Sequence, residues 1–321
     1  MVVRITPMPN KPSSPTFSLF LPQAGMSYAQ IRDRAQTLER LGYDGLWLVD
    51  HFWAGGAPDL DFVEGWTALA ALAEATQRLR LGLLVTCNSY RHPGLVAKMA
   101  ATVDQVSGGR AELGMGAGWM ESEYRAYGYD FPPIPQRLAQ LGEGLEVITR
   151  LFGGGRTDFQ GDHYRIQDAP FAPVPVQSPL PITIGGAGEK VLLKLVAKYA
   201  QRWNCPMNAA PEIPRLREVL ADHCAKIGRD PAEIITSEQT VVVLGKDRKE
   251  YEAKRELAEL LVGGFADLNT VAVAGTPDDV IAGLRAKIQD KGVQDFAILF
   301  GDFGMDDTLE LFAEKVMPAL R

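Results

Sequence analysis

Short apolar segments alternate with longer amphipathic segments along almost the whole chain. The apolar runs predict β-strands, and the segments between them have apolar residues at every third or fourth position, which predicts helices. A repeated strand-helix pattern is typical of parallel βα units. The predicted strands are residues 17–21, 46–50, 79–86, 111–115, 181–184, 202–205, 240–244 and 296–300. These eight units predict an α/β fold, a closed TIM (β/α)8 barrel.

The predicted helices follow the strands one by one. They are residues 29–41, 65–78, 94–106, 136–151, 189–200, 213–227, 249–261 and 308–320, with an additional helix at 277–289. An open doubly wound sheet is the alternative fold. It usually has Gly-x-Gly-x-x-Gly after its first strand, but Pro22-Gln23-Ala24-Gly25 stands at that place here. The pattern therefore favours the barrel.

Two insertions interrupt the alternation. Residues 153–180 contain three consecutive glycines and four prolines and are too long for an ordinary loop, so we expect an excursion with a short hairpin around 159–165. Residues 262–275 connect the seventh helix to a helix that begins at Thr276-Pro277. Because α/β barrels fold as one unit well above the usual domain size, we expect a single domain at residues 16–321. The proline-rich residues 1–15 predict a flexible N-terminal tail.

Composition and charge favour a small-molecule partner. Of the 321 residues, 46% are hydrophobic and 23% are charged, which is typical of a globular protein. The net charge of −7 disfavours binding to nucleic acid or to an anionic membrane. Three scattered cysteines predict no disulfide framework and no zinc site, and no run reaches the roughly 18 apolar residues of a membrane helix. The start of the chain also lacks the apolar core of a signal peptide, so we expect a cytoplasmic protein.

Candidate catalytic residues follow the strands, because TIM-barrel sites lie at the carboxyl ends of the strands. His51 comes directly after the second strand and places an imidazole, the side chain best suited to acid–base chemistry, at the rim of the barrel, so it is the candidate proton carrier. A histidine bonded to a neighbouring loop is the alternative interpretation. Asp50 is a weaker candidate, since adjacent residues of an extended strand point to opposite sides. His92, before Pro93 at a helix start, is expected to be structural.

Polar and glycine-rich segments follow the next strands. Thr86, Cys87 and Asn88 end an apolar run, which indicates either a pocket lining or an ordinary loop. Cys87 has no histidine nearby, so we expect it to pack rather than to act as a nucleophile. After the fourth strand, Gly116 and Gly118 let a planar ligand or another backbone approach closely, and Trp119 can stack on a ring or belong to the core.

A glycine-rich turn follows the fifth strand. Gly185, Gly186 and Gly188 lead into a predicted helix, and exposed amides at a helix start form a natural phosphate site. The turn lacks the Gly-Lys-Ser/Thr ending of a Walker loop, so triphosphate hydrolysis is not indicated. Lys190, Lys194 and Lys198 share one helix face, which we expect to be solvated. Taken together, the strand ends predict a phosphate site, a flat apolar slot and one proton carrier.

These motifs resemble the bacterial luciferase-like monooxygenase superfamily over residues 17–320. The resemblance is to the branch that uses the deazaflavin coenzyme F420, although branches that use FMN share most of the motifs. The motifs are Asp50-His51-Phe52, Leu81-Gly82-Leu83-Leu84-Val85-Thr86, Arg91-His92-Pro93, Ser107-Gly108-Gly109-Arg110, Gly116-Ala117-Gly118-Trp119 and Pro181-Ile182-Thr183-Ile184-Gly185-Gly186.

The resemblance implies where the cofactor lies. The cofactor ring is expected at the carboxyl ends of the strands, on a backbone bulge near Leu84 and Val85 that contains a nonprolyl cis peptide in F420-dependent relatives. His51 is expected beside the reactive face. The glycine-rich turn is expected to hold the phosphate. The full set of cofactor-binding residues implied in this way is Leu84, Val85, Thr86, Asn88, Gly116, Gly118, Trp119, Gly185, Gly186 and Gly188.

One departure from the family concerns the substrate. The sugar-phosphate dehydrogenase branch carries Glu after its Gly-x-Gly, where this chain has Trp119. Because of this departure, we expect neither a glucose 6-phosphate substrate nor the two-residue acid–base scheme of that branch.

The resemblance favours an F420-dependent oxidoreductase that transfers a hydride to or from a small organic substrate, with His51 as acid or base. The alternative is an FMN-dependent monooxygenase supplied by a separate reductase. A third hypothesis is a flavin-binding relative that has lost turnover. A barrel hydrolase is disfavoured, because no convincing pair of carboxylates follows the strands. We expect no metal and, as in many relatives, a homodimer.

Overall fold

Eight parallel strands close a barrel in the part of the chain that the structure describes. The structure is a computed structural model that describes residues 13–264 and 266–321. The predicted TIM barrel is confirmed, and β10 pairs with both β9 and β12 to close it. Around the barrel the strands are β1 (Thr16–Phe20), β2 (Gly45–Leu48), β3 (Arg80–Leu83), β5 (Ala111–Gly116), β8 (Ile182–Gly185), β9 (Arg202–Cys205), β10 (Ile235–Leu244) and β12 (Asp295–Phe300).

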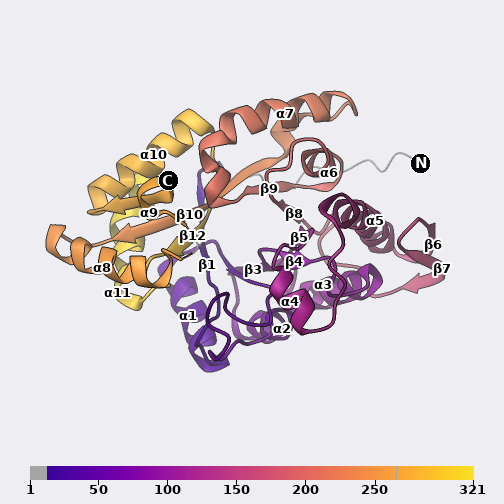
Figure 1. The fold of residues 1–321 in the computed structure, drawn as a ribbon, viewed down its shortest axis with the longest axis horizontal. Helices are drawn as coiled ribbons and strands as arrows, with labels where there is room; N and C mark the ends of the chain where they lie inside the picture. Colours follow the sequence, from indigo (N-terminus) through magenta and orange to yellow (C-terminus); the bar gives the residue numbers. More distant parts are fainter. Residues whose placement is uncertain (1–12, 265) are drawn as a thin grey trace.

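Helices form the outer layer around these strands (Figure 1). Their ends follow local sequence signals: Ser27 caps the first helix and Gly42 ends it in a left-handed conformation. Among the described residues, none of the helices is long and apolar enough to cross a membrane. The main helices are α1 (Tyr28–Leu41), α2 (Gly65–Ala75), α3 (Pro93–Ser107), α5 (Ile134–Phe152), α6 (Leu192–Tyr199), α7 (Ile213–Ala225), α8 (Arg248–Leu261), α10 (Pro277–Lys291) and α11 (Asp306–Leu311).

The two insertions have structure of their own. In the first, β6 (Gly155–Gln160) and β7 (Arg165–Phe171) form an antiparallel hairpin at the edge of the molecule (Figure 1). In the second, α9 (Leu268–Val271) leads into β11 (Ala272–Gly275), which adds to β10 in parallel and which the sequence pattern did not predict. Most of the predicted tail, up to residue 12, lies outside the described residues.

Some helix boundaries differ from those predicted. A short helix, α4 (Glu121–Ala126), was not predicted. The predicted helix 308–320 is divided into α11, a π-helical turn (Phe312–Val316) and α12 (Met317–Leu320). Pro318 lies in the first turn of α12 and lacks the N–H that a continuous helix would use.

The interior of the barrel combines large apolar side chains with glycines. Phe20, Trp47, Val241 and Leu299 belong to one buried cluster. A Cβ atom on Gly82 would lie 2.3 Å from the Trp47 ring, so the glycine on β3 makes room for the indole of β2.

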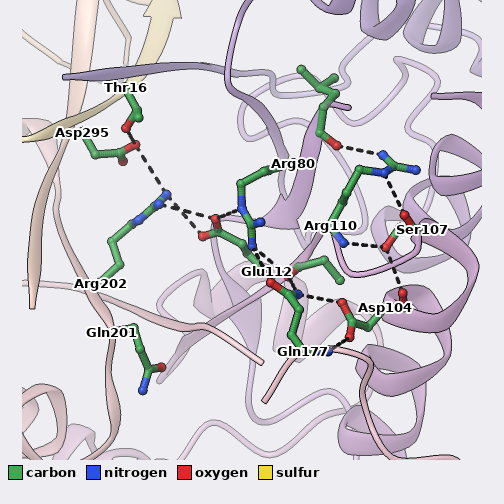
Figure 2. Close-up of polar contacts among 12 residues, drawn as sticks. Thr16, Arg80, Asp104, Ser107, Arg110, Glu112, Gln177, Gln201, Arg202 and Asp295 are labelled. Carbon is green, nitrogen blue, oxygen red and sulfur yellow. Dashed lines mark hydrogen bonds and ion pairs between the residues drawn. The ribbon is translucent and has the colours of Figure 1, made fainter. Parts of the chain in front are cut away.

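Charged residues close the amino end of the barrel (Figure 2). The buried Arg202 guanidinium lies 3.2 Å from Glu112 and 3.4 Å from Asp295, and Arg80 lies 2.5 Å from Glu112. Burial would raise the pKa of Glu112, but Arg202 and Arg80 hold it below its ordinary value. A cavity of about 30 Å³ lies among these side chains. The ion pairs therefore tie β3, β5, β9 and β12 together across the barrel.

Replacing Glu112 by Gln should destabilise the fold strongly. The amide keeps the volume but leaves Arg202 and Arg80 with one carboxylate fewer, and breaking a buried ion pair costs about 3–5 kcal/mol. We expect a loss of this size in the free energy of unfolding, measured by urea denaturation. Glu252→Gln, in an exposed pair with Arg248, is the matched control and should cost less than about 1 kcal/mol. Equal losses in the two variants would contradict a bracing role for the buried network.

Candidate active site

The chain between β3 and β4 (Thr86–Cys87) forms a backbone bulge at the carboxyl end of the barrel. The Leu84–Val85 peptide is cis, as the family resemblance implied, and β4 continues beyond it along β5. A Cβ atom on Gly116 would lie 2.4 Å from the Val85 side chain, and one on Gly185 would lie 3.0 Å from it. The glycines of β5 and β8 therefore provide the space that Val85 fills, whether or not they also contact a cofactor.

His51 forms a close pair with a carboxylate that the sequence analysis did not identify. Its Nδ1 atom lies 2.7 Å from Oε2 of Glu123, which is fully buried on α4. Oε1 of the same carboxylate accepts the backbone N–H of Phe52 at 2.6 Å. Among the described residues, no protein partner contacts the Nε2 atom of His51 within hydrogen-bond distance. Nε2 is therefore the atom that can exchange a proton with a substrate.

The surroundings of Glu123 keep it ionised. Burial alone would raise the pKa of Glu123, but the hydrogen bond and charge of His51, the Phe52 amide and the Tyr90 hydroxyl lower it below its ordinary value. Tyr90 donates to Oε2 at 2.8 Å, and burial raises the pKa of this phenol, so it remains a neutral donor. An ionised Glu123 accepts the Nδ1 proton of His51 and thereby fixes the orientation and tautomer of the imidazole.

Asp50 has a structural role in the same region. Its carboxylate accepts a hydrogen bond from the backbone N–H of Cys87 at 2.8 Å and another from the Arg91 guanidinium at 2.8 Å. Burial raises the pKa of Asp50, although Arg91 offsets part of this effect. Asp50 thus connects the end of β2 with the loop after β4. The preference for His51 over Asp50 as the proton carrier fits this arrangement.

Trp119 and Gly118 lie at the end of β5 but in different environments. The Trp119 side chain is 66% exposed, and its ring meets the His51 ring edge-on at 5.6 Å. Gly118 has a φ of +77°, and a Cβ atom there would lie 1.9 Å from the Tyr124 hydroxyl. Packing against Tyr124 therefore explains the glycine without a ligand.

The glycine-rich turn differs from the predicted helix start. Helix α6 begins at Leu192, so the prediction of a helix from residue 189 is wrong. The Gly186 N–H bonds to the Asn204 carbonyl at 3.0 Å and is not available to a phosphate. In the described chain, the amides of Ala187 and Gly188 have no protein acceptor. If a phosphate binds at this turn, these two amides are the donors that it would meet.

Most of the predicted site residues gather at the carboxyl ends of β2, β4, β5 and β8, and their cofactor contacts stay predictions. Thr86 and Asn88 are buried; the Asn88 amide donates to the Tyr164 hydroxyl at 3.0 Å, and its oxygen has no partner among the described residues. Leu84 and Val85 are half-buried and form an apolar surface. The predicted structural role of His92 holds: its side chain caps α3.

A separate cleft of about 690 Å³ lies beside these residues. Its lining includes Ser89, Tyr129, Asp130, Gln136 and Tyr164 but neither His51 nor the glycine-rich turn. The cleft is thus distinct from the candidate proton carrier.

Comparisons with known proteins agree with this architecture. The model of the luciferase-like monooxygenase family matches residues 8–269. The F420-dependent glucose-6-phosphate dehydrogenase of Amycolatopsis mediterranei is 33% identical over 167 residues, which are 51% of this chain and 48% of that protein. The chain thus spans about half the length of this relative. The pyrimidine monooxygenase RutA of Stutzerimonas stutzeri is 26% identical over 81% of this chain and 79% of that protein.

A solved structure shows the same fold. An F420-dependent secondary alcohol dehydrogenase, in complex with an F420-acetone adduct, superposes with a TM-score of 0.84. The superposition covers 96% of this chain and 99% of the other, at 20% sequence identity.

Cys87 should be unreactive in the folded protein. It is buried with its sulfur 3.1 Å from the Tyr124 hydroxyl, and burial raises the pKa of the thiol to about 11. At pH 8 only about one thiol in a thousand would then be ionised. A chromogenic disulfide reagent should label none of the three buried cysteines quickly at pH 8 and all three in urea. Labelling of Cys87 in the native protein at the rate of a free thiol would restore it as a candidate nucleophile.

Proposed function

Because the chain belongs to the luciferase-like monooxygenase family, we propose that it is an F420-dependent oxidoreductase acting on a small organic substrate. The observation that carries the proposal is the His51–Glu123 pair at 2.7 Å, at the same end of the barrel as the Leu84–Val85 bulge. Coenzyme F420, when bound, supplies or accepts a hydride. Reduction of a carbonyl also requires a proton on the oxygen, and a carboxylate-oriented imidazole is suited to provide it.

In the proposed reaction, His51 would transfer the proton and Glu123 would stabilise the charge on the imidazole. In the direction of reduction, protonated His51 donates a proton from Nε2 to the substrate oxygen while the carbon gains a hydride. Glu123 stabilises the imidazolium before this transfer and stays ionised throughout. In the reverse direction, neutral His51 accepts the hydroxyl proton at the same atom.

The residues present fit the coenzyme. Leu84 and Val85 offer a half-buried apolar surface for a planar ring. The amides of Ala187 and Gly188 would hold the phosphate. Leu84, Val85, Thr86, Asn88, Gly116, Gly118, Trp119, Gly185, Gly186 and Gly188 remain the proposed cofactor-binding set, in which Gly186 would contact the coenzyme through atoms other than its amide, since that amide bonds to the Asn204 carbonyl.

The second candidate is an FMN-dependent monooxygenase with a separate reductase. It is favoured by the match to a pyrimidine monooxygenase over 81% of the chain. A homodimer and a cytoplasmic location stay predictions under both functions.

We expect F420 to bind at least tenfold more tightly than FMN. Residues 50–52 resemble the F420 branch, and the similar dehydrogenase of Amycolatopsis mediterranei is F420-dependent by name. Titrations of oxidised F420 and of FMN, side by side in one buffer, measure the difference. Tighter binding of FMN would move the protein to the monooxygenase function.

A pair of variants checks that this binding uses the glycine-rich turn. Gly186 is unsuitable, since its φ is +133° and a Cβ atom would lie 2.8 Å from Leu192. At Gly188 a Cβ atom would meet Leu192 at an ordinary 3.4 Å. Gly188→Asp should weaken F420 binding at least tenfold more than Gly188→Asn, because only the carboxylate repels a phosphate. Equal affinities would place the phosphate elsewhere.

Replacing His51 by Asn should slow the chemical step and leave cofactor affinity nearly unchanged. Loss of a general acid or base costs about 10²–10⁴-fold in rate. Glu123→Gln should also slow this step at least tenfold, because an amide cannot stabilise the imidazolium. The measurement is single-turnover oxidation of bound reduced F420 by a carbonyl substrate.

Glu121→Gln is the matched control on the same helix. Its carboxylate pairs with Arg125 at the surface, so the variant should react within about threefold of the wild type. A folded, cofactor-binding His51→Asn protein with the wild-type rate would remove His51 from the mechanism.

A further inference from the structure

Four aromatic residues, two of them exposed, lie on the loop after β2 and on the segment after β5. We call Phe52, Trp53, Trp119 and Tyr127 the aromatic wall. Trp119 is 66% exposed and Tyr127 is 54% exposed. The Tyr127 ring stacks on Phe52 at 4.1 Å and on Trp53 at 5.7 Å, which connects the loop after β2 with α4. Because the Trp119 ring meets the His51 ring at 5.6 Å, a molecule that reacts at His51 would lie close to Trp119.

The charges around the wall are mostly negative. Residues 49–64, 88–92 and 117–133, all within the described chain, carry seven carboxylates and two guanidinium groups. Both guanidinium groups are already paired: Arg91 with Asp50 and Glu64, and Arg125 with Glu121. These segments therefore offer no free cation to an anionic substrate.

On α5, Arg137 has no carboxylate partner and its Nε is unpartnered among the described residues, but its side chain is not exposed. Arg137 is buried, donates to the Pro132 carbonyl at 2.5 Å and lies over the Phe131 ring at 3.9 Å. A phosphate or carboxylate beside His51 would lose hydration, and the one cation it would meet in these segments, the His51 imidazolium, is already balanced by Glu123 at 2.7 Å. A flat uncharged molecule would instead cover exposed aromatic surface.

We infer that the substrate is a flat, apolar carbonyl compound without an anionic group, and that Trp119 is the residue that selects it. The inference rests on the proposed function for the reaction at His51. In that reaction the carbonyl carbon gains a hydride from reduced 5-deazaflavin and the oxygen gains the His51 proton, so the product is the alcohol and the coenzyme is oxidised. Trp119 stacks on the flat face of the substrate and takes no part in proton transfer.

Binding of two aryl ketones that differ by a para carboxylate tests the inference without turnover. Acetophenone is uncharged, and 4-acetylbenzoate carries a carboxylate. Ligand-observed NMR titrations of the full chain, with and without oxidised F420, should show acetophenone binding at least tenfold more tightly. Trp119→Ala should weaken acetophenone binding about fivefold or more, and Trp119→Phe should restore it to within about threefold of the wild type. Leu260→Ala, at an 81% exposed leucine away from the wall, is the control and should change nothing.

Introducing a positive charge at position 119 should reverse the preference between the two ketones. Trp119→Lys supplies the missing cation, so it should bind 4-acetylbenzoate more tightly than the wild type does and acetophenone less tightly. Equal or tighter binding of 4-acetylbenzoate by the wild type would overturn the inference, as would a Trp119→Ala protein with unchanged affinities.

The two proposals fail in different ways. If F420 does not bind or no hydride is transferred, the proposed function fails. The relative affinities of the cofactor-free protein for the two ketones still test whether the aromatic wall prefers an uncharged ligand. If F420 binds and oxidises or reduces a substrate that carries a phosphate, the function stands and the inference about the substrate is wrong.

Discussion

The buried Glu123 carboxylate is the interaction on which the site depends. It accepts hydrogen bonds from the His51 ring, the Phe52 backbone and the Tyr90 hydroxyl, which belong to the segments after β2 and β4. Burying a carboxylate costs free energy unless its oxygens accept hydrogen bonds. Hydrogen bonds to a charged oxygen are stronger than those to a neutral one, so Glu123 fixes the positions of all three partners. One side chain on a six-residue helix thus connects both of these loops to α4 and orients the imidazole.

The two ends of the barrel satisfy their charges in different ways. At the amino end, Arg202, Glu112 and Asp295 pair inside the barrel and connect its strands. At the carboxyl end, the Glu123 charge lies outside the strands, and the barrel itself offers the apolar bulge at Val85. The amino end can therefore be closed for stability while the carboxyl end keeps room for reacting molecules, a division typical of TIM barrels.

Much of the fold could be predicted from the sequence, because eight buried strands and their helices each carry a periodic pattern. The pattern fails where an element is too short to show a period: α4 has six residues and β11 has four. Glu123 was missed for this reason, although a carboxylate seven residues beyond a strand end was a signal that could have been weighed. For Gly118 the sequence left a ligand contact and a close backbone approach both open, and Gly185 was expected to contact a phosphate. Packing against Tyr124 and Val85 also requires these two glycines, and only the three-dimensional structure brings those side chains close.

The hydrogen bonds around Glu123 also determine which group can change its protonation. Tyr90 and His51 both bind Oε2, but burial raises the pKa of Tyr90, so the phenol is no source of protons near neutral pH. Glu123 has its pKa lowered and is no source either. Of these three groups, His51 is therefore the one left to carry the proton that the proposed hydride transfer would require. Because a carboxylate already balances the imidazolium, an anionic substrate would add an uncompensated charge at the same place, and an uncharged one would not.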